Sequence, residues 1–243
     1  MWAESRDLWY NEQVVNGREK SWLNRADWLT FWAVSGVVLA AYVCSLGPSI
    51  GLEDAGELAT AADVLGVPHP PGYPLWTVLS WVFCRCFSWV GWQGFPNAAW
   101  AVALGSAVMG ALACGVTALL IARSARDLLH ADGAWHGFTC AVAGASGGLM
   151  LAFTPGLWSQ SVIVEVYALG ALFLALTLLL AYRWLAVGRP STLVWLGLVF
   201  GLGLTNYQVL LLAALPLGGL VCVRRWRLAR SFVCVAVPLG LTG

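Results

Sequence analysis

Apolar runs of about the length of a membrane-crossing helix constrain this chain more than any other feature of its sequence. They cover 28–50, 74–95, 97–122, 137–156, 162–182, 191–206 and 207–223, and a further run begins near 231. A helix needs about 20 apolar residues to cross a bilayer, whereas a membrane β-strand needs about 10 in alternation. The chain is 60% hydrophobic and only 10% charged. These runs predict an all-α, polytopic transmembrane helical bundle of six or seven membrane helices.

Composition excludes several classes of partner and site. A formal net charge of +1 gives no support to nucleic acid as a partner. Nearly all of the seven cysteines fall inside apolar runs, where a thiol packs as a small hydrophobe, and no disulfide or metal spacing is visible. Residues 1–27 are polar and are not a cleavable signal. Their interleaved Trp and Arg fit a segment at the lipid headgroups, and a disordered cytoplasmic tail fits equally well.

Short arginine-rich segments between the apolar runs predict the orientation of the chain. They contain Arg123 and Arg126, then Arg183 and Arg189, then four arginines at 224–230. Arginine and lysine gather in cytoplasmic loops, so we expect these segments and the N-terminus on the cytoplasmic side. The segment 51–73 is then an extracytoplasmic loop that carries short interfacial helices.

The stretch 74–122 contains two apolar runs but crosses the membrane once in this arrangement, because it begins outside and ends inside. Its first run, which contains Arg85, is then expected to be broken, to re-enter the membrane or to lie along its interface. Two full crossings, with every later loop reversed, are the alternative. The first arrangement brings 157–165 and 205–208 to the same outer face as the acidic loop.

The segment 51–75 separates two apolar runs and holds four carboxylates, Glu53, Asp54, Glu57 and Asp63, without lysine or arginine. Placing a carboxylate at a membrane costs free energy, so such residues often mark functional sites. Asp54 and Glu57 stand three residues apart and so share one face of a predicted helix. Such a pair can divide acid and base roles or hold a divalent cation, with Mg²⁺ and Mn²⁺ as candidates. The alternative is that these acids only solvate a first helical turn.

The proline-rich sequence from His69 to Pro74 leads the chain back toward the membrane. Each proline fixes its own φ and pushes the preceding residue toward extended conformations. We therefore expect His69 on a rigid extended strut, where its imidazole can contact a phosphate or position a hydroxyl, with Tyr73 beside it as a second substrate-binding residue. A turn residue satisfied by backbone groups is the alternative for His69.

Polar residues farther along the chain are candidates to line the same pocket. Gln160, Glu165 and Tyr167 belong to one segment, and we expect Glu165 to lie one or two turns inside a membrane helix, where a carboxylate needs a partner or water. Asn206 interrupts a long apolar run and can donate a hydrogen bond into the site. The alternatives are a structural ion pair between Glu165 and an arginine, and a tight outer turn at Asn206.

Together these motifs resemble a bacterial membrane family related to protein O-mannosyltransferases, a eukaryotic branch of which glycosylates extracellular domains of cell-surface receptors. The resemblance covers roughly 25–225, and its longest signature lies between 53 and 75. It rests on Glu-Asp-Ala-Gly-Glu at 53–57, Leu-Gly-Val-Pro-His-Pro-Pro-Gly-Tyr-Pro-Leu at 65–75, Trp-Ser-Gln at 158–160, Glu-Val-Tyr at 165–167 and Leu-Thr-Asn at 204–206.

The resemblance implies a GT-C fold and the transfer of a mannose-like sugar from a polyprenyl-phosphate donor to a hydroxyl of a protein or glycan acceptor. Asp54 corresponds to the catalytic acid of the first outer loop and would be the general base. Glu57 would support Asp54 or a metal ion, Glu53 would contribute to substrate binding, and His69 matches the His-Pro-Pro element. The implied location is the bacterial cytoplasmic membrane, with the active face outside the cytoplasm and membrane lipid as a partner.

Two departures from the family pattern bear on these expectations. Tyr207 stands where relatives often have histidine, and relatives usually have further spans. We therefore expect an N-terminal segment, 1–27, and a GT-C-like domain, 28–243, that is incomplete at its C-terminal end. A transporter or lipid-binding membrane protein is one alternative function, and an inactive fragment or assembly subunit of a glycosyltransferase is another. No pattern in the sequence indicates an oligomeric state.

Overall fold

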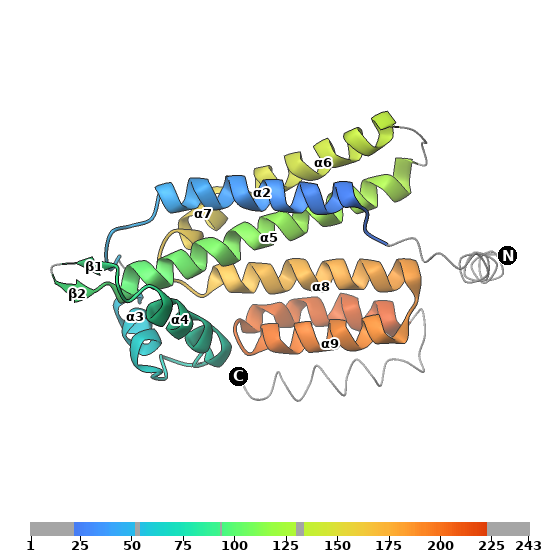
Figure 1. Cartoon of the computed structure of the whole chain (residues 1–243). Coiled ribbons are helices and arrows are strands. Elements are labelled where there is room, and N and C mark those ends of the chain that lie inside the picture. Colours follow the sequence, from blue (N-terminus) through green and yellow to red (C-terminus); the bar gives the residue numbers. More distant parts are fainter. Residues whose placement is uncertain (1–21, 52–53, 93, 130–133, 223–243) are drawn as a thin grey trace.

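The computed structural model describes residues 22–51, 54–92, 94–129 and 134–222 of the chain (Figure 1). Apart from one hairpin of two short antiparallel strands, its regular structure is helical, which confirms the predicted all-α class. The elements are α2 (Arg25–Cys44), α3 (Ala55–Val64), α4 (Pro74–Cys86), β1 (Gly91–Trp92), β2 (Phe95–Pro96), α5 (Ala98–Leu129), α6 (Ala134–Ala152), α7 (Pro155–Ser161), α8 (Tyr167–Val187), α9 (Pro190–Leu204) and the 3₁₀-helix η1 (Gln208–Ala213).

Local sequence signals explain where several helices begin and end. Asn24 and Asp27 form a capping box at the start of α2, in which each side chain accepts a hydrogen bond from the other residue's backbone N–H. Pro74 and Pro190 occupy the first turns of α4 and α9, where a missing N–H leaves no bond unmade. Helix α8 ends at Gly188, whose φ of 74° suits glycine.

The 32-residue helix α5 is the central element and packs against α2, α6 and α8 (Figure 1). Its buried face consists largely of alanine and glycine, which allow helix axes to approach closely inside a membrane. The approach of α6 is close enough that a Cβ added at Gly148 would lie 2.8 Å from the Cys114 carbonyl oxygen on α5. Small side chains therefore hold the bundle together at its centre.

Three helices in the described residues are long and apolar enough to cross a membrane: α2, α5 and α8. Helices α6 and α7 form a bent pair, with 69° between them, that counts as a fourth candidate span when taken together. Two shorter apolar helices follow, α9 and the helix at Gln208–Cys222. The prediction of six or seven membrane helices thus corresponds, in this part of the chain, to three or four spans of full length and two short apolar helices.

The region 74–122 contains one helix long enough to span a bilayer. Helix α4 has 13 residues, which corresponds to roughly 20 Å at 1.5 Å per residue, and the β1–β2 hairpin separates it from α5. It packs with α3 and α5 at one end of the bundle (Figure 1). This arrangement agrees with the expectation that the first of the two apolar runs does not cross the membrane.

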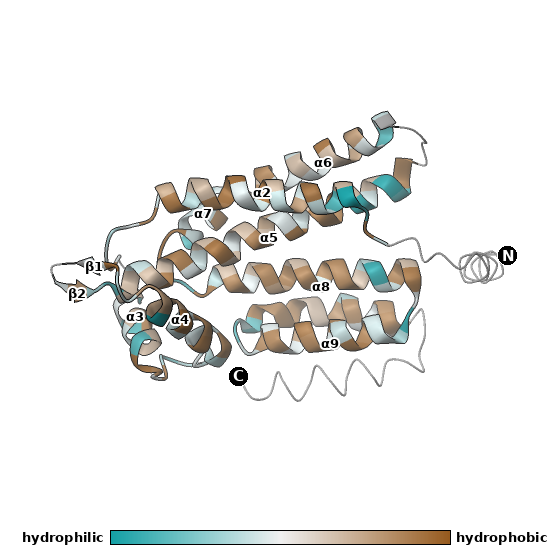
Figure 2. Cartoon of the chain, in the orientation of Figure 1, coloured by the Kyte–Doolittle hydropathy of each residue, from teal (hydrophilic) through white to brown (hydrophobic). Residues whose placement is uncertain are grey.

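The polar segments separate to opposite ends of the bundle. Arg123 near the end of α5 and Arg183 near the end of α8 both lie against the Trp22 ring, so two of the arginine groups meet at one end. Hydrophilic residues are visible there at the start of α2 and the end of α5 (Figure 2). The α3–α4 region lies at the other end (Figure 1). The third arginine group, 224–230, lies outside the described residues.

Candidate active site

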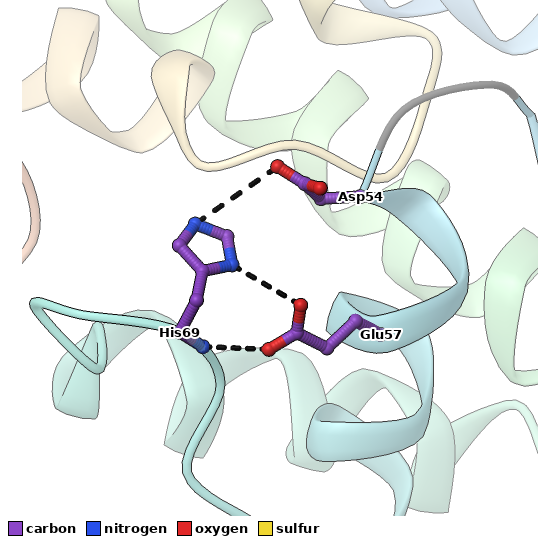
Figure 3. A group of neighbouring side chains, drawn as sticks. All are labelled: Asp54, Glu57 and His69. Carbon is purple, nitrogen blue, oxygen red and sulfur yellow. Dashed lines mark hydrogen bonds and ion pairs between the residues drawn. The ribbon is translucent and has the colours of Figure 1, made fainter.

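The start of α3 and the turn that follows it bring together Asp54, Glu57 and His69 (Figure 3). Asp54 is the residue before the helix, and its carbonyl accepts the first helical hydrogen bond, from Leu58 N–H at 2.9 Å. Glu57 lies in the first turn. One potential ligand atom from each of the three side chains lies within 4.8 Å of the other two. The predicted common face of the two carboxylates is therefore present, and it is directed at the imidazole.

The two carboxylates differ in their contacts with His69 and in their exposure. Its backbone N–H donates to Glu57 Oε1 at 2.6 Å, and its ring Nδ1 lies 3.3 Å from Glu57 Oε2. Asp54 Oδ2 is 4.0 Å from ring Nε2 and forms no capping hydrogen bond with its own helix. The Asp54 side chain is also the more exposed, at 63% against 50% for Glu57. Glu57 is thus engaged with His69, whereas the Asp54 carboxylate is largely exposed.

The segment after His69 is a turn, so the expectation of an extended strut was wrong. Gly72 N–H donates to the His69 carbonyl at 3.0 Å, and the Pro70–Pro71 peptide bond is cis. The turn that was the alternative for His69 is present, because its carbonyl accepts this hydrogen bond from Gly72, while its ring faces the carboxylates. Contact of the imidazole with a phosphate or a hydroxyl of a substrate stays a prediction. Prolines restrict their own φ and the residue before them, but Gly72, whose φ is 89°, lets the chain reverse its direction after them.

Tyr73 completes the group from the other side of this turn. Its φ is 43°, a left-handed conformation that costs a residue with a side chain about 1–2 kcal/mol. The phenolic oxygen lies 3.3 Å from His69 Nε2, and the two rings meet edge to face, 5.4 Å apart. The strained backbone at the start of α4 therefore directs the phenol toward the imidazole.

The electrostatic surroundings of Tyr73 show which distant segments reach this end of the bundle. Partial burial raises its pKa above the usual value of 10.0, and electrostatic interactions with Tyr167, Glu165, Asp54 and Tyr207, in that order, raise it further. The phenol is therefore protonated at neutral pH and can donate a hydrogen bond. Parts of the α7–α8 linker and of the segment after α9 therefore lie close to Tyr73. The common outer face expected for 157–165 and 205–208 stays a prediction.

Glu165 lies in the linker between α7 and α8, which corrects the prediction that it lies one or two turns inside a helix. Helix α8 begins at Tyr167. The Glu165 carbonyl accepts hydrogen bonds from Trp76 Nε1 and Ser106 Oγ, each at 3.2 Å, and its carboxylate accepts one from the Val166 N–H at 3.2 Å. The residue is 6% exposed. Helices α4 and α5 thus fix the linker, and Glu165 with it.

A small cavity of about 10 Å³ lies against Glu165. Its lining includes the hydroxyl-bearing Ser80 and Ser106 and the aromatic Trp76. This volume is close to the minimum that one water molecule occupies, and hydroxyl and carboxylate groups are suitable partners for it.

Asn206 and Tyr207 connect the segment after α9 to the same linker. Asn206 is fully buried, and its Nδ2 donates to the Val166 carbonyl at 3.2 Å. The backbone N–H groups of both residues donate to the Gly203 carbonyl, so the tight turn that was the alternative for Asn206 is present. The Tyr207 ring meets the Tyr167 ring edge to face at 5.2 Å. Asn206 therefore holds the linker in place, and the Tyr207 ring packs against Tyr167 at the start of α8.

Among the described residues, one predicted site residue, Gln160, is not part of this group. Gln160 lies on α7, half-buried, and its Oε1 is buried without a hydrogen-bond partner in the described ranges. Its neighbour Trp158 contacts Tyr42 and Ser45 at the end of α2. Glu53 lies outside the described residues.

Three residues at the site, Trp76, Ser106 and Tyr207, had no role predicted from the sequence. Trp76 and Ser106 are single polar groups inside apolar runs, so nothing in their neighbourhood distinguishes them from packing residues. The sequence could have identified Tyr207, since this residue belongs to the polar stretch 205–208 between two apolar runs. Arg85, in contrast, is already engaged: its guanidinium bonds the carboxylate and carbonyl of Asp63 on α3.

These observations define a class: a helical membrane protein with a carboxylate–imidazole site at one end of its bundle. The chain belongs to the protein O-mannosyl-transferase TMEM260 N-terminal domain family, whose model matches residues 54–230. The match begins at Asp54 and includes the whole described site.

Two relatives support the same assignment. The protein O-mannosyl-transferase TMEM260 of Mus musculus is 31% identical over 202 residues, which are 82% of this chain and 25% of the relative. The Dictyostelium discoideum protein of that name is 28% identical over 182 residues, 70% of this chain and 20% of the relative. The chain thus spans a fifth to a quarter of these relatives. No solved structure matches it.

Proposed function

We propose that this chain contributes the catalytic end of a membrane mannosyltransferase of the GT-C type, which moves mannose from a polyprenyl-phosphate donor to a hydroxyl of a protein or glycan. Asp54 is the general base. The observation that carries the proposal is the exposed Asp54 carboxylate beside a Glu57–His69 pair, at the end of the bundle where the α7–α8 linker and the segment after α9 also lie. The names of both relatives, protein O-mannosyl-transferases, point to the same reaction.

The reaction follows from the position of Asp54. Its carboxylate accepts the proton of the acceptor hydroxyl, which requires an approach of about 2.6–3.2 Å. The hydroxyl oxygen forms a bond to the anomeric carbon as the bond from that carbon to the phosphate oxygen breaks, and the bonding electrons leave with the phosphate. One displacement of this kind inverts the anomeric configuration. The 63% exposure of Asp54 leaves room for a hydroxyl.

The other residues of the group position the reactants. Glu57 holds the His69 ring, and Tyr73 presents a protonated phenol beside it. Neutral donors of this kind can stabilise the negative charge that develops on the departing phosphate. Arg85 is held by Asp63, so His69, Tyr73 and Tyr167 are the better candidates for this role.

A divalent cation is a second proposal for the same three side chains. Two carboxylates and an imidazole within 4.8 Å of one another can converge on one ion. The nitrogen ligand suits Mn²⁺ better than Mg²⁺, which takes oxygen ligands and water. Such an ion would supply positive charge for the leaving phosphate. It would have to replace the direct contact between His69 and Glu57.

The transporter alternative is less well supported by the geometry. Transporters bind their ions near the middle of the bilayer, on interrupted membrane helices. The Asp54 group instead lies with α3 at one end of the bundle (Figure 1). We further propose that this end faces outward from a bacterial cytoplasmic membrane, because the opposite end carries Arg123, Arg126 and Arg183.

Replacement of Asp54 by asparagine tests the function. Asp54→Asn keeps the size of the side chain but removes its basicity, so transfer from lipid-linked mannose should fall by about 10²- to 10⁴-fold. The measurement is mannose incorporation into acceptor by membranes that contain the variant, with membrane insertion verified by fractionation. Asp63→Asn is the matched control, since this acid on the same helix pairs with Arg85 and faces no imidazole. Normal transfer by Asp54→Asn would remove Asp54 from the mechanism.

A further inference from the structure

A cluster of arginines surrounds one tryptophan at the end of the bundle opposite Asp54. We name it the Trp22 cluster; it consists of Trp22, Asp27, Arg123, Arg126, Asp127, Tyr182 and Arg183. These residues come from the segment before α2, from α2 itself and from the C-terminal turns of α5 and α8. The proposed reaction uses none of them.

Trp22 is the centre of the cluster. The guanidinium carbon of Arg123 lies 5.4 Å from its ring centroid, and that of Arg183 lies 5.9 Å away. Arg123 Nε also donates to the Trp22 carbonyl at 2.9 Å. Both distances are within the range of cation–π attraction, which keeps two like charges beside one ring.

Positive charge exceeds negative charge in this cluster. Arg126 Nη1 donates to both carboxylate oxygens of Asp27 at 2.8 Å, and Asp27 is fully buried. Arg123 pairs with Asp127, to which Tyr182 Oη also donates. Arg183 has no ion pair with any described carboxylate. One guanidinium group thus lacks a counter-charge within the described ranges.

Hydrogen-bond donors are also in excess. Trp22 Nε1, Arg126 Nη2 and Arg183 Nε are each buried and have no acceptor among the described residues. Buried donors nearly always have a partner in native proteins. Three such donors beside an uncompensated positive charge indicate an acceptor that carries negative charge, and a phosphate group offers several oxygens for them.

The depth of the cluster identifies the source of that phosphate. Ser106 of α5 reaches the Glu165 carbonyl at the active end. Arg123 and Arg126 lie roughly 25–30 Å farther along the same helix at 1.5 Å per residue. The hydrocarbon core of a bilayer is about 30 Å thick, and tryptophan and arginine gather at its boundaries. The cluster therefore lies at the headgroups of one leaflet when the active end lies at the other.

We propose that the Trp22 cluster binds the phosphate of an anionic phospholipid headgroup, in the leaflet opposite the active site. Arg183 and Trp22 Nε1 hold the phosphate oxygens, and Arg126 donates from Nη2 while its Nη1 stays paired with Asp27. This proposal concerns a lipid that remains bound, and it holds whether or not the chain transfers mannose.

Lipid retention by the purified chain tests the proposal. Native mass spectrometry is performed after titration with phosphatidylglycerol or, separately, phosphatidylcholine. We expect Arg183→Gln to weaken phosphatidylglycerol binding about fivefold, the usual effect of one arginine near an anionic surface. Arg183→Lys keeps the charge and should retain most of the affinity. Phosphatidylcholine binding should be the same in wild type and variants.

Arg85→Gln is the matched control, because it removes the same charge at the other end of the bundle and should leave lipid binding unchanged. Circular dichroism verifies that each variant is folded. If Arg183→Gln does not fold, the comparison of the two lipids on wild type and on Arg183→Lys decides the question. Equal affinity of wild type for the two lipids, or equal phosphatidylglycerol affinity of wild type and Arg183→Gln, would overturn the proposal.

Two other acceptors are separate outcomes. Inorganic phosphate that binds as tightly as phosphatidylglycerol would show a site for a free anion, which contradicts a lipid. Carboxylates of the chain's own N-terminal segment are the other candidate, so Glu4, Asp7, Glu12 and Glu19 are changed together to their amides. If this variant loses as much thermal stability as Arg183→Gln and neither alters lipid retention, those acids are the partners and the lipid proposal is wrong.

Discussion

At the scale of residues, the proposed site depends on different roles for two neighbouring carboxylates, those of Asp54 and Glu57. Glu57 makes both of its contacts with His69, so Glu57→Gln should disturb the imidazole while the base remains. We expect a fall of about tenfold in the maximum rate, less than for Asp54→Asn, because only positioning is lost. The measurement is transfer rate against donor concentration, repeated across a Mn²⁺ titration. A shift in the Mn²⁺ dependence would identify Glu57 as a ligand, and a loss equal to that of Asp54→Asn would contradict the division of roles.

The same scale shows how far the sequence alone defines this site. The spacing of Asp54 and Glu57 was sufficient to predict a shared face, but the prolines after His69 predicted an extended strut and not the turn that is present beside these carboxylates. The direction of the Tyr73 side chain was not predictable, because it depends on a positive φ that tyrosine rarely adopts. Glu165 was misplaced for a related reason: hydropathy does not report backbone dihedrals, so the apolar run at 162–182 conceals the break before α8.

At the scale of elements, α4 and α5 hold the α7–α8 linker through the Glu165 carbonyl. Trp76→Phe removes one of its two side-chain donors, and the loss of a buried hydrogen bond costs about 1 kcal/mol. We expect thermal unfolding of the chain in detergent to shift down by about 2–4 °C. Trp195→Phe, at an exposed position on α9, should leave the midpoint unchanged. An equal shift in both variants would mean that the aromatic volume matters and the hydrogen bond does not.

At the scale of the whole molecule, the separation of charge along the bundle predicts its orientation in the membrane. The arginines at the ends of α5 and α8 meet at Trp22, and the carboxylates lie with α3 at the other end, so one end must face the cytoplasm and the other must face away. The positive-inside rule assigns the arginine end to the cytoplasm.

Val67→Cys and Leu128→Cys, both at exposed positions, report the two ends in a cysteine-free background. A membrane-impermeant maleimide should label residue 67 in intact cells and residue 128 only after permeabilisation. The reverse pattern would place the carboxylates in the cytoplasm, where the proposed transfer to an external acceptor could not occur.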